Sequence, residues 1–155
     1  MTENLVPKIK KEAKNVEDQI LKRKKPTMKF PVRSLANVKY VEKDGYFEIR
    51  GMKKERTLTV NTVKTFAQTL RMMALSKTLV ETDDIATKRE AYYVSKNWGD
   101  ARFLEQTESD TVMDDIEALF SVRGVSREQL RFVPDEHGGA VAGQLVVLDP
   151  DRETG

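Results

Sequence analysis

The sequence predicts a mixed α+β fold, in which a basic helix and a small β-ribbon precede three helices and a terminal β-hairpin. Three observations predict this order. Apolar residues recur at helical spacing in four segments, residues 28–60 carry short β-rich runs around an Asp-Gly pair, and the last β-rich runs surround a Gly-Gly pair. With 155 residues, the chain has the length of one ordinary domain and can bury a core.

The first predicted helix spans residues 2–25 and is amphipathic and rich in lysine. Its apolar residues make a narrow stripe at helical spacing: Leu5, Ile9, Ala13, Val16, Ile20 and Leu21. Pro26 then ends the helix. Because the stripe is narrow, we expect this helix to dock on a partner or to lie loosely on the body. We therefore assign residues 1–27 as a partner-docking segment.

Residues 28–60 are predicted to form the β-ribbon. The runs 38–41 and 46–49 flank Lys43-Asp44-Gly45, and an Asp-Gly pair between two β-rich runs is a hairpin signal. Residues 57–60, Thr-Leu-Thr-Val, have the composition of a third short strand. This segment contains no catalytic motif.

The predicted main domain is residues 61–150, with residues 151–155 as a tail. Its first helix spans residues 61–80, and either Asn61 or Thr62 can cap it. The apolar face of this helix is Val63, Phe66, Ala67, Leu70, Met73 and Ala74. We expect Met72 and Met73 to fill space in the core rather than to bind a soft ligand.

The second helix is predicted over residues 85–98. Thr87 and Glu90 have the spacing of a capping box, in which each residue's side chain accepts a backbone N–H of the other. The apolar stripe consists of Ala91, Val94 and Trp98. Gly99 follows as a natural stop.

The third helix is predicted over residues 108–122, ending near Gly124, with a further short turn at 126–129. The inward side chains are Val112, Met113, Ile116, Leu119 and Phe120, and we expect the acidic residues Asp110, Asp114, Asp115 and Glu117 largely on the outer side. Residues 130–133 and 141–148 then form the terminal hairpin. Three helices followed by a β-hairpin is the order of a winged-helix domain, which often binds DNA.

The charge of the chain is distributed unevenly. The net charge is +5 over residues 1–30, +4 over residues 31–100 and −7 over residues 101–155. This distribution suggests that the basic N-terminal part meets an anionic partner such as nucleic acid.

The chain has no Cys and a single His, which excludes disulfide scaffolds, thiol catalysis and His-pair metal sites. The polar start and the lack of a long apolar run lead us to expect an intracellular, cytoplasmic protein.

The second helix carries the candidate for chemistry. Tyr93 is two positions from Ala91, so it points about 200° away from the apolar stripe. Arg89, Lys96 and Asn97 lie three or four positions from Tyr93 and are expected to share its face. A phenol is mostly protonated at neutral pH, and nearby cations favour its phenolate form. The same cations can bind a phosphodiester, so this face suits nucleophilic attack on phosphorus, although a surface tyrosine beside an arginine is also common as simple packing.

Several blocks of sequence closely resemble the A subunit of archaeal DNA topoisomerase VI, a family shared with the meiotic enzymes that make double-strand breaks. The blocks are residues 30–37 (Phe-Pro-Val-Arg-Ser-Leu-Ala-Asn), 89–93 (Arg-Glu-Ala-Tyr-Tyr), 97–99 (Asn-Trp-Gly), Gln106, 108–110 (Glu-Ser-Asp), 114–117 (Asp-Asp-Ile-Glu), 127–130 (Arg-Glu-Gln-Leu) and 143–149 (Gly-Gln-Leu-Val-Val-Leu-Asp). Together they span most of residues 28–150. Arg131 departs from the pattern, because the resemblance leads us to expect a smaller residue there.

The resemblance implies a CAP-like winged-helix domain in which Tyr93 is the nucleophile of an ATP-dependent type II topoisomerase. Arg89 would contact the scissile phosphate, and Tyr92, Lys96 and Asn97 would join it in binding double-stranded DNA. Two A subunits would each link a tyrosine to a 5′ DNA end, and an ATP-binding B subunit would meet the N-terminal segment in an A2B2 complex.

The resemblance also implies what this chain leaves to other parts of the enzyme. The Mg²⁺ ligands would lie in a Toprim domain beyond the residues present here, so no metal ligand is expected in this chain. We therefore expect the isolated chain to cleave DNA poorly or not at all.

Two other functions remain open at this point. The chain could be a non-enzymatic winged-helix module that binds DNA, although its third helix is acidic and phosphate repels such a helix. It could also be an interaction protein whose first helix docks a partner. Tyr93 discriminates among the three functions, because only the transesterase requires its hydroxyl.

Overall fold

The computed structural model describes residues 5–42, 46–49, 51–126 and 128–134, and within them the fold is α+β, as predicted. The described α-helices are α1 (Leu5–Leu21), α2 (Val63–Thr82), α3 (Lys88–Ser95) and α4 (Gln106–Ser121). The described strands are β1 (Thr27–Pro31), β2 (Val38–Val41), β3 (Tyr46–Ile49), β4 (Lys53–Thr57), β5 (Ala86–Thr87) and β6 (Phe132–Val133). Short 3-10 turns are η1 (Leu35–Asn37), η2 (Gly99–Ala101) and η3 (Glu128–Leu130).

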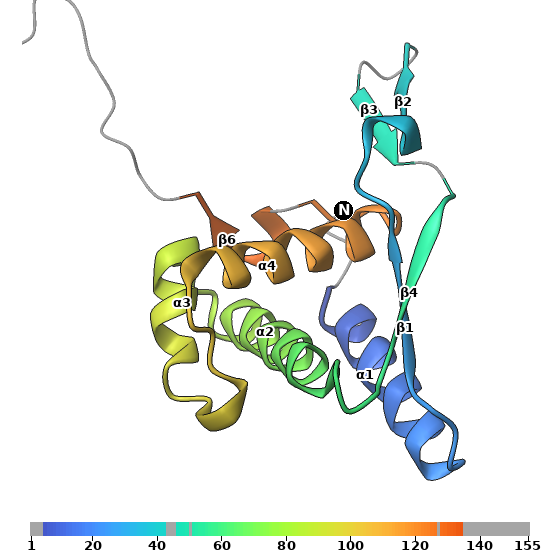
Figure 1. The fold of residues 1–155 in the computed structure, drawn as a ribbon. Coiled ribbons are helices and arrows are strands. Elements are labelled where there is room, and N and C mark those ends of the chain that lie inside the picture. Colours follow the sequence, from blue (N-terminus) through green and yellow to red (C-terminus); the bar gives the residue numbers. More distant parts are fainter. Residues whose placement is uncertain (1–4, 43–45, 50, 127, 135–155) are drawn as a thin grey trace, which may run out of the picture.

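Helix α2 lies in the middle of the molecule, with α1 on one side and α4 packed across it (Figure 1). Its buried residues are Phe66, Gln68, Thr69, Met72, Met73, Ser76 and Leu79. Met72 and Met73 are core residues, as predicted. Val63 and Ala74 are exposed instead of inward, because α2 is covered from two sides and its buried surface is not the single stripe that the sequence predicted.

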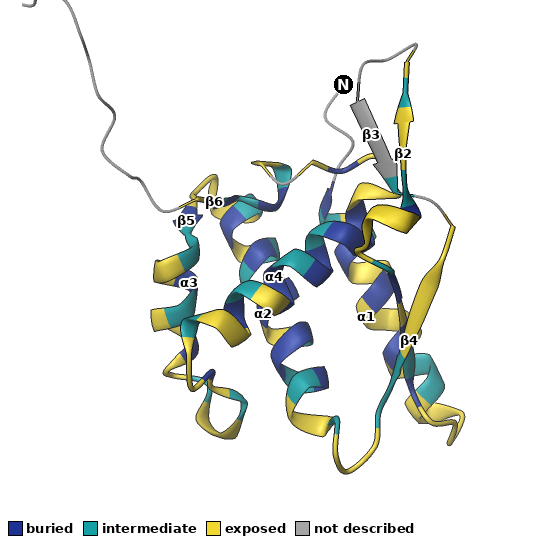
Figure 2. Cartoon of the chain, turned by 45° about the horizontal axis from the view of Figure 1, so that its top comes forward, coloured by how far each residue is buried: buried dark blue, intermediate teal, exposed yellow. Residues whose placement is uncertain are grey.

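Helix α1 belongs to the core of the molecule. Leu5, Ile9 and Val16 are each 3% exposed and pack in the same buried cluster as Phe66 and Met73 of α2. The expectation that this helix lies loosely on the body is therefore wrong. The helix also ends at Leu21, earlier than the predicted boundary at residue 25, and Ile20 and Leu21 at its end are exposed. Figure 2 shows the buried face of α1 turned toward α2.

Helix α1 is also tied to the turn that follows α4. The Lys8 ammonium donates a hydrogen bond of 2.6 Å to the Arg123 carbonyl oxygen. The Arg123 guanidinium in turn forms an ion pair with Glu12, whose side chain is nearly buried. These contacts join α1 to the turn after α4 and add to the apolar packing that holds α1 in place.

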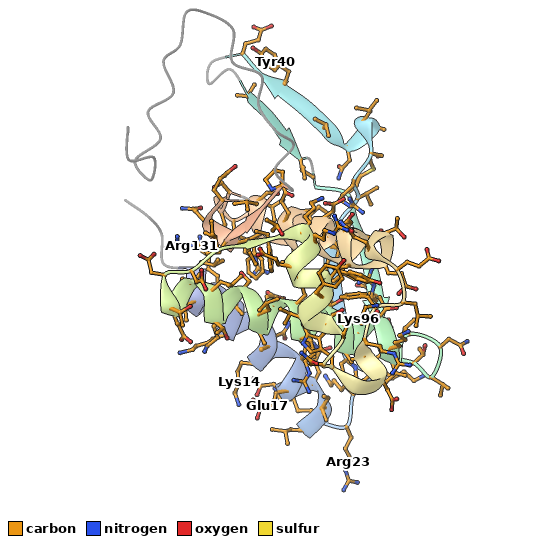
Figure 3. The ribbon with its side chains drawn as sticks, turned by 90° about the vertical axis from the view of Figure 1, so that its left-hand side faces the viewer. Lys14, Glu17, Arg23, Tyr40, Lys96 and Arg131 are labelled. Carbon is orange, nitrogen blue, oxygen red and sulfur yellow. The ribbon has the colours of Figure 1, made fainter. Side chains whose placement is uncertain are left out.

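The N-terminal strands form two separate ribbons. β2 pairs with β3 in the predicted antiparallel hairpin, which projects away from the helices and carries Tyr40 (Figure 3). β1 pairs with β4 in antiparallel register, Thr27 opposite Thr57 and Pro31 opposite Lys53, and lies against α4. The predicted third strand at 57–60 is wrong: the strand ends at Thr57. Its position was missed because Lys53-Lys54-Glu55-Arg56 is charged throughout, and a strand at the edge of the fold needs no apolar alternation.

Helix α4 is buried on most of its surface. The predicted inward residues Val112, Met113, Ile116, Leu119 and Phe120 are all buried. The prediction for Asp115 is wrong, since this carboxylate is 0% exposed.

Among the described residues, no helix is both long and apolar enough to cross a membrane.

The segment after α4 contacts α2 and the start of α3. The buried Ser76 hydroxyl of α2 donates to the Leu130 carbonyl oxygen at 2.8 Å, and β6 pairs in parallel with β5. The described part of the predicted hairpin thus pairs with residues 86–87, while its second strand, 141–148, lies outside the described residues.

Arg131, where the resemblance led us to expect a smaller residue, has a φ of 66°, in the left-handed region that favours glycine. Its side chain forms an ion pair with Asp83.

Candidate functional site

Helix α3 carries the candidate residues and begins at the predicted capping box. The Glu90 backbone N–H donates to the Thr87 hydroxyl at 3.1 Å, and the Thr87 N–H donates to the Glu90 carboxylate at 2.7 Å. The pairing of Ala86 and Thr87 with β6 fixes the residues just before the helix. Because a helix of eight residues is unstable alone in water, these contacts and tertiary packing must hold it in place.

The buried side of α3 differs in part from the prediction. Ala91 is fully buried, as predicted, and Ser95 one turn later is the other buried residue of the helix. Val94 is 40% exposed, so its assignment to the apolar stripe is wrong. The helix ends at Ser95 rather than at residue 98. Asn97 therefore lies in the turn after α3, and Trp98 is half-buried there.

Tyr93 points away from the core, as its spacing from Ala91 predicts. The residue is 55% exposed, and the Arg89 guanidinium carbon lies 5.9 Å from the centroid of its ring. The Tyr92 ring is tilted against the Tyr93 ring, with 5.5 Å between the two centroids. An exposed phenol with a cation one helical turn away is open to an anionic ligand arriving from solvent.

Tyr92 and Lys96 face the loop that follows α3. The half-buried Tyr92 donates its hydroxyl hydrogen to the Leu104 carbonyl oxygen at 2.9 Å. The Lys96 ammonium, labelled in Figure 3, donates to the Tyr92 oxygen at 2.6 Å and to the Phe103 carbonyl oxygen at 2.8 Å. Its charge is thus held beside Tyr92 rather than beside Tyr93, where helical spacing had put it. The assignment of Tyr92, Lys96 and Asn97 to DNA binding stays a prediction.

Two neighbouring carboxylates of α4 connect α3 to the N-terminal strands. Asp115 accepts hydrogen bonds from Arg56 Nη2 at 2.7 Å and from Arg33 Nε at 3.1 Å. Asp114 accepts one from Arg33 Nη1 at 2.9 Å and one from Lys88 Nζ at 3.3 Å. A continuous chain of ion pairs therefore runs from β4, through α4, to the first residue of α3.

Sequence reasoning missed this ion-pair chain. Arg33 and Arg56 are 82 and 59 positions away from Asp115, so no local spacing links them. Arg56 is further held by its position over the Phe30 ring, 4.7 Å from the centroid, and by a 3.2 Å bond to the Thr69 hydroxyl. The burial of Asp115 is possible because its charge is paired with both arginines. The one sequence signal of this burial is the Asp-Asp pair itself, which stands among the apolar residues of the helix.

Comparison with known proteins agrees with the resemblance. The family described as type IIB DNA topoisomerase matches residues 64–131, which include α3 and α4 entirely. A protein of Methanocaldococcus jannaschii, named as the A subunit of type 2 DNA topoisomerase 6, is 47% identical over 141 residues, which is 91% of this chain and 37% of the relative. The chain belongs to the type IIB DNA topoisomerase family.

Other relatives of the same name support membership of the type IIB family. The protein of Methanothermobacter thermautotrophicus is 31% identical over 149 residues, covering 96% of this chain and 41% of the relative. The protein of Pyrococcus horikoshii is 33% identical over 156 residues, covering 97% and 38% respectively. The chain thus spans about two-fifths of the length of these type IIB relatives. Tyr93 and Arg89 lie inside the segment that matches the family, whereas Arg33 and Arg56 precede it.

The described residues do not hold a metal site of the kind expected for type IIB enzymes. Over residues 5–134, apart from the undescribed positions 43–45, 50 and 127, there is no group of three or more His, Cys, Asp or Glu side chains that could bind an ion. Asp114 and Asp115 are paired with cationic side chains instead. The described part of this chain therefore does not fit a Mg²⁺ ion.

Proposed function

We propose that this chain is the tyrosine-bearing part of the A subunit of an ATP-dependent type II DNA topoisomerase, in which Tyr93 becomes transiently linked to DNA. The observation that carries the proposal is the exposed phenol of Tyr93 beside Arg89, on a capped helix inside the segment that matches the family. The order α2, α3, α4 and β6 supports a winged-helix domain as the setting of this helix.

The proposed reaction is a transesterification. The phenolic oxygen of Tyr93 attacks a backbone phosphorus while its proton is lost to solvent, and the bond from phosphorus to the 3′ oxygen breaks. The 3′ oxygen leaves and is protonated, and the 5′ phosphate stays on the tyrosine. Because one phosphodiester replaces another, the 3′ hydroxyl can reverse the attack and reseal the strand. Arg89 would bind the nonbridging oxygens and stabilise the charge that grows on them.

Other regions of the assembly would supply the remaining parts of the reaction. Double-stranded DNA would lie across the exposed face of α3, and two A subunits would each cut one strand. The Mg²⁺ ion would be held by a Toprim domain, and ATP by the B subunit. The described residues supply the nucleophile and its cation and leave metal and nucleotide chemistry to those parts.

A groove between α1 and α2 supports the proposal that the B subunit docks at the N-terminal segment. The groove has a volume of about 360 Å³, and the apolar residues that line it are Ile9, Ala13, Val16, Ile20, Leu21, Leu70, Met73 and Ala74. Ile20 and Leu21 are 52% and 70% exposed. Apolar side chains gathered in an open groove are typical of a surface that binds another protein.

The test is to trap the covalent complex. This chain would replace the matching part of the Methanocaldococcus jannaschii relative, and the chimaera would be mixed with the B subunit of that enzyme, supercoiled DNA, Mg²⁺ and ATP. Denaturant would then stop the reaction, and protein attached to 5′ ends would be measured. We expect attachment that disappears with Tyr93→Phe and persists with the control Tyr40→Phe, which removes the same hydroxyl from the β2–β3 hairpin. Attachment that survived Tyr93→Phe would contradict the proposal.

Arg89→Ala tests the second role in the same assay. We expect attachment to slow by roughly 100-fold, the usual effect of removing one group that stabilises transition-state charge, and DNA affinity to fall much less. Equal losses in rate and affinity would instead make Arg89 a simple phosphate anchor.

A further inference from the structure

We infer that Asp114 is a positioning residue for the tyrosine helix: it ties the first turn of α3 to the segment just after β1 and so sets the orientation of Arg89 and Tyr93. This inference rests on the proposed function, because it concerns the group that would attack DNA. Asp114 would not touch the DNA itself and would act only through Lys88.

The two oxygens of Asp114 are committed to different parts of the fold. Oδ1 accepts a hydrogen bond from Lys88 Nζ at 3.3 Å, and Oδ2 accepts one from Arg33 Nη1 at 2.9 Å. The Lys88 and Asp114 side chains are 21% and 33% exposed, so this pair is largely shielded from solvent. A largely shielded pair is screened less by salt than a surface pair and holds its geometry better.

The partner of Asp114 on the ribbon side is itself fixed. Arg33 Nε donates to Asp115, and this fully buried carboxylate also accepts from Arg56 of β4. Arg33 is therefore held by two adjacent carboxylates of α4 in a bidentate-like arrangement that restricts its rotation. Asp114 thus has a fixed partner on one side and the short helix α3 on the other.

The importance of the Lys88–Asp114 pair follows from a comparison with the other contacts that hold α3. The capping box lies within the first turn of the helix and its own N-cap, so it fixes the start of the helix but not its position against α4. Tyr92 and Lys96 tie the far end to the carbonyl groups of residues 103 and 104. The Lys88–Asp114 pair ties the first turn to the middle of α4. Lys88 immediately precedes Arg89, so a shift of the first turn moves the cation and the phenol together, and a misplacement of about 1 Å can slow a reaction roughly 100-fold.

Asp114→Asn distinguishes a positioning role from a role in DNA binding, because only the second would lower the affinity for DNA. The variant removes one negative charge, so DNA affinity should stay unchanged or rise, while the rate of covalent attachment at saturating DNA should fall about 10-fold in the chimaera. Glu81→Gln is the matched control, because it removes the same charge from an ion pair on α2. An unchanged rate, or a parallel fall in rate and affinity, would overturn the inference.

A double-substitution cycle tests whether the effect passes through Lys88. Lys88→Met keeps the length of the side chain and removes the ammonium, and it should slow attachment as much as Asp114→Asn does. The double variant should be no slower than either single one, and Asp114→Glu should recover part of the rate. Effects that multiply in the double variant would show that Asp114 acts by another route.

A measurement without DNA separates this inference from the proposed function. The 155-residue chain labelled with ¹³C-tyrosine would be examined by NMR, with the Tyr93 ring signal assigned through Tyr93→Phe. In Asp114→Asn we expect that signal to shift, while the signal of Tyr40 on the β2–β3 hairpin stays in place and reports an intact fold. If the unaltered chimaera fails to attach to DNA, the proposed function fails and this arm still decides the inference. A Tyr93 signal unmoved by Asp114→Asn would overturn it.

Discussion

The contacts that join the first sixty residues to the helical body differ in emphasis between α1, which is mainly apolar, and the β1–β4 ribbon, which adds a buried ionic cluster. Helix α1 packs on α2 through apolar side chains such as Ile9 and Val16, each 3% exposed. The β1–β4 ribbon buries Met28 and Phe30 in the same core. It differs from α1 in that Arg56 and the nearby Arg33 converge on the buried carboxylate of Asp115. The apolar interface is a sum of many small contacts. The ionic contacts converge on one carboxylate: without it, Arg33 keeps only Asp114, and Arg56 loses its ion-pair partner. We therefore expect the two interfaces to fail in different ways.

The largest effect is expected from Asp115→Ala. Removing one partner of a buried ion pair typically costs about 3–5 kcal/mol, because the remaining charges lose their compensation. Urea unfolding monitored by the fluorescence of Trp98 would measure the loss. Asp114→Ala on the same helix is the control and should cost clearly less, since its side chain is partly exposed. A loss below about 1 kcal/mol for Asp115→Ala would mean that water solvates the arginines well enough to replace the carboxylate. The ionic and apolar contacts would then not differ in the way we expect.

A graded effect is expected on the apolar side. Ile9→Val removes one methylene from the α1–α2 contact and should lower the free energy of unfolding by about 1 kcal/mol. Since no charge is involved, the loss should be the same at low and high salt. A loss as large as that of Asp115→Ala would show that α1 is not held by additive packing.

Ile20 lies at the open end of the same interface and should matter for binding rather than for folding. Because it is half exposed, Ile20→Ser should change the stability of the chain by less than about 0.5 kcal/mol. The affinity of the chimaera for the B subunit, measured by calorimetry, should fall about 10-fold. Val60→Ser, which alters another highly exposed apolar residue away from the groove, is the control. Equal affinity in the two variants would remove the groove from the proposed interface.

The smallest effect is expected where an ion pair lies at the surface, as between Lys77 and Glu81. Lys77 lies 2.6 Å from Glu81 and, through that hydrogen bond, lowers the pKa of the Glu81 carboxyl. A lowered pKa contributes stability above the ordinary carboxyl range, and this contribution is lost as the pH falls. Glu81→Gln should therefore unfold almost like the parent chain at neutral pH, with any difference fading in acid. A difference that grew in acid would contradict this sign.

The same contrast explains what the sequence could predict of the fold. The capping box at Thr87, the β2–β3 hairpin and the core positions of α4 follow from residues close together in the chain, and all were predicted. The position of β4 and the burial of Asp115 depend on partners that are brought together by the fold. Local periodicity carries no signal for such pairs, because a charged residue on a helix is usually solvated.

In the candidate site, too, the features set by local spacing were predictable and those that depend on distant partners were not. The exposure of Tyr93 and its closeness to Arg89 follow from helical spacing alone, and the resemblance named both residues. The Lys96 side chain, however, bends toward carbonyl groups of the next loop, which helical spacing cannot anticipate. The tie from Asp114 to Lys88 was likewise invisible, since it joins two helices. The roles of these residues toward DNA stay predictions.

The parallel pairing of β5 with β6 bears on the order in which the domain assembles. Ala86 pairs with Phe132, which is 46 positions later, so the contact closes a long loop and its entropy cost is met only after α4 has docked. Helix α3 begins at the residue after β5 and is too short to persist alone. We therefore expect α3 to be among the last elements to become protected against hydrogen exchange during refolding, and Tyr93 to be displayed in an ordered position only once the rest of the domain is complete.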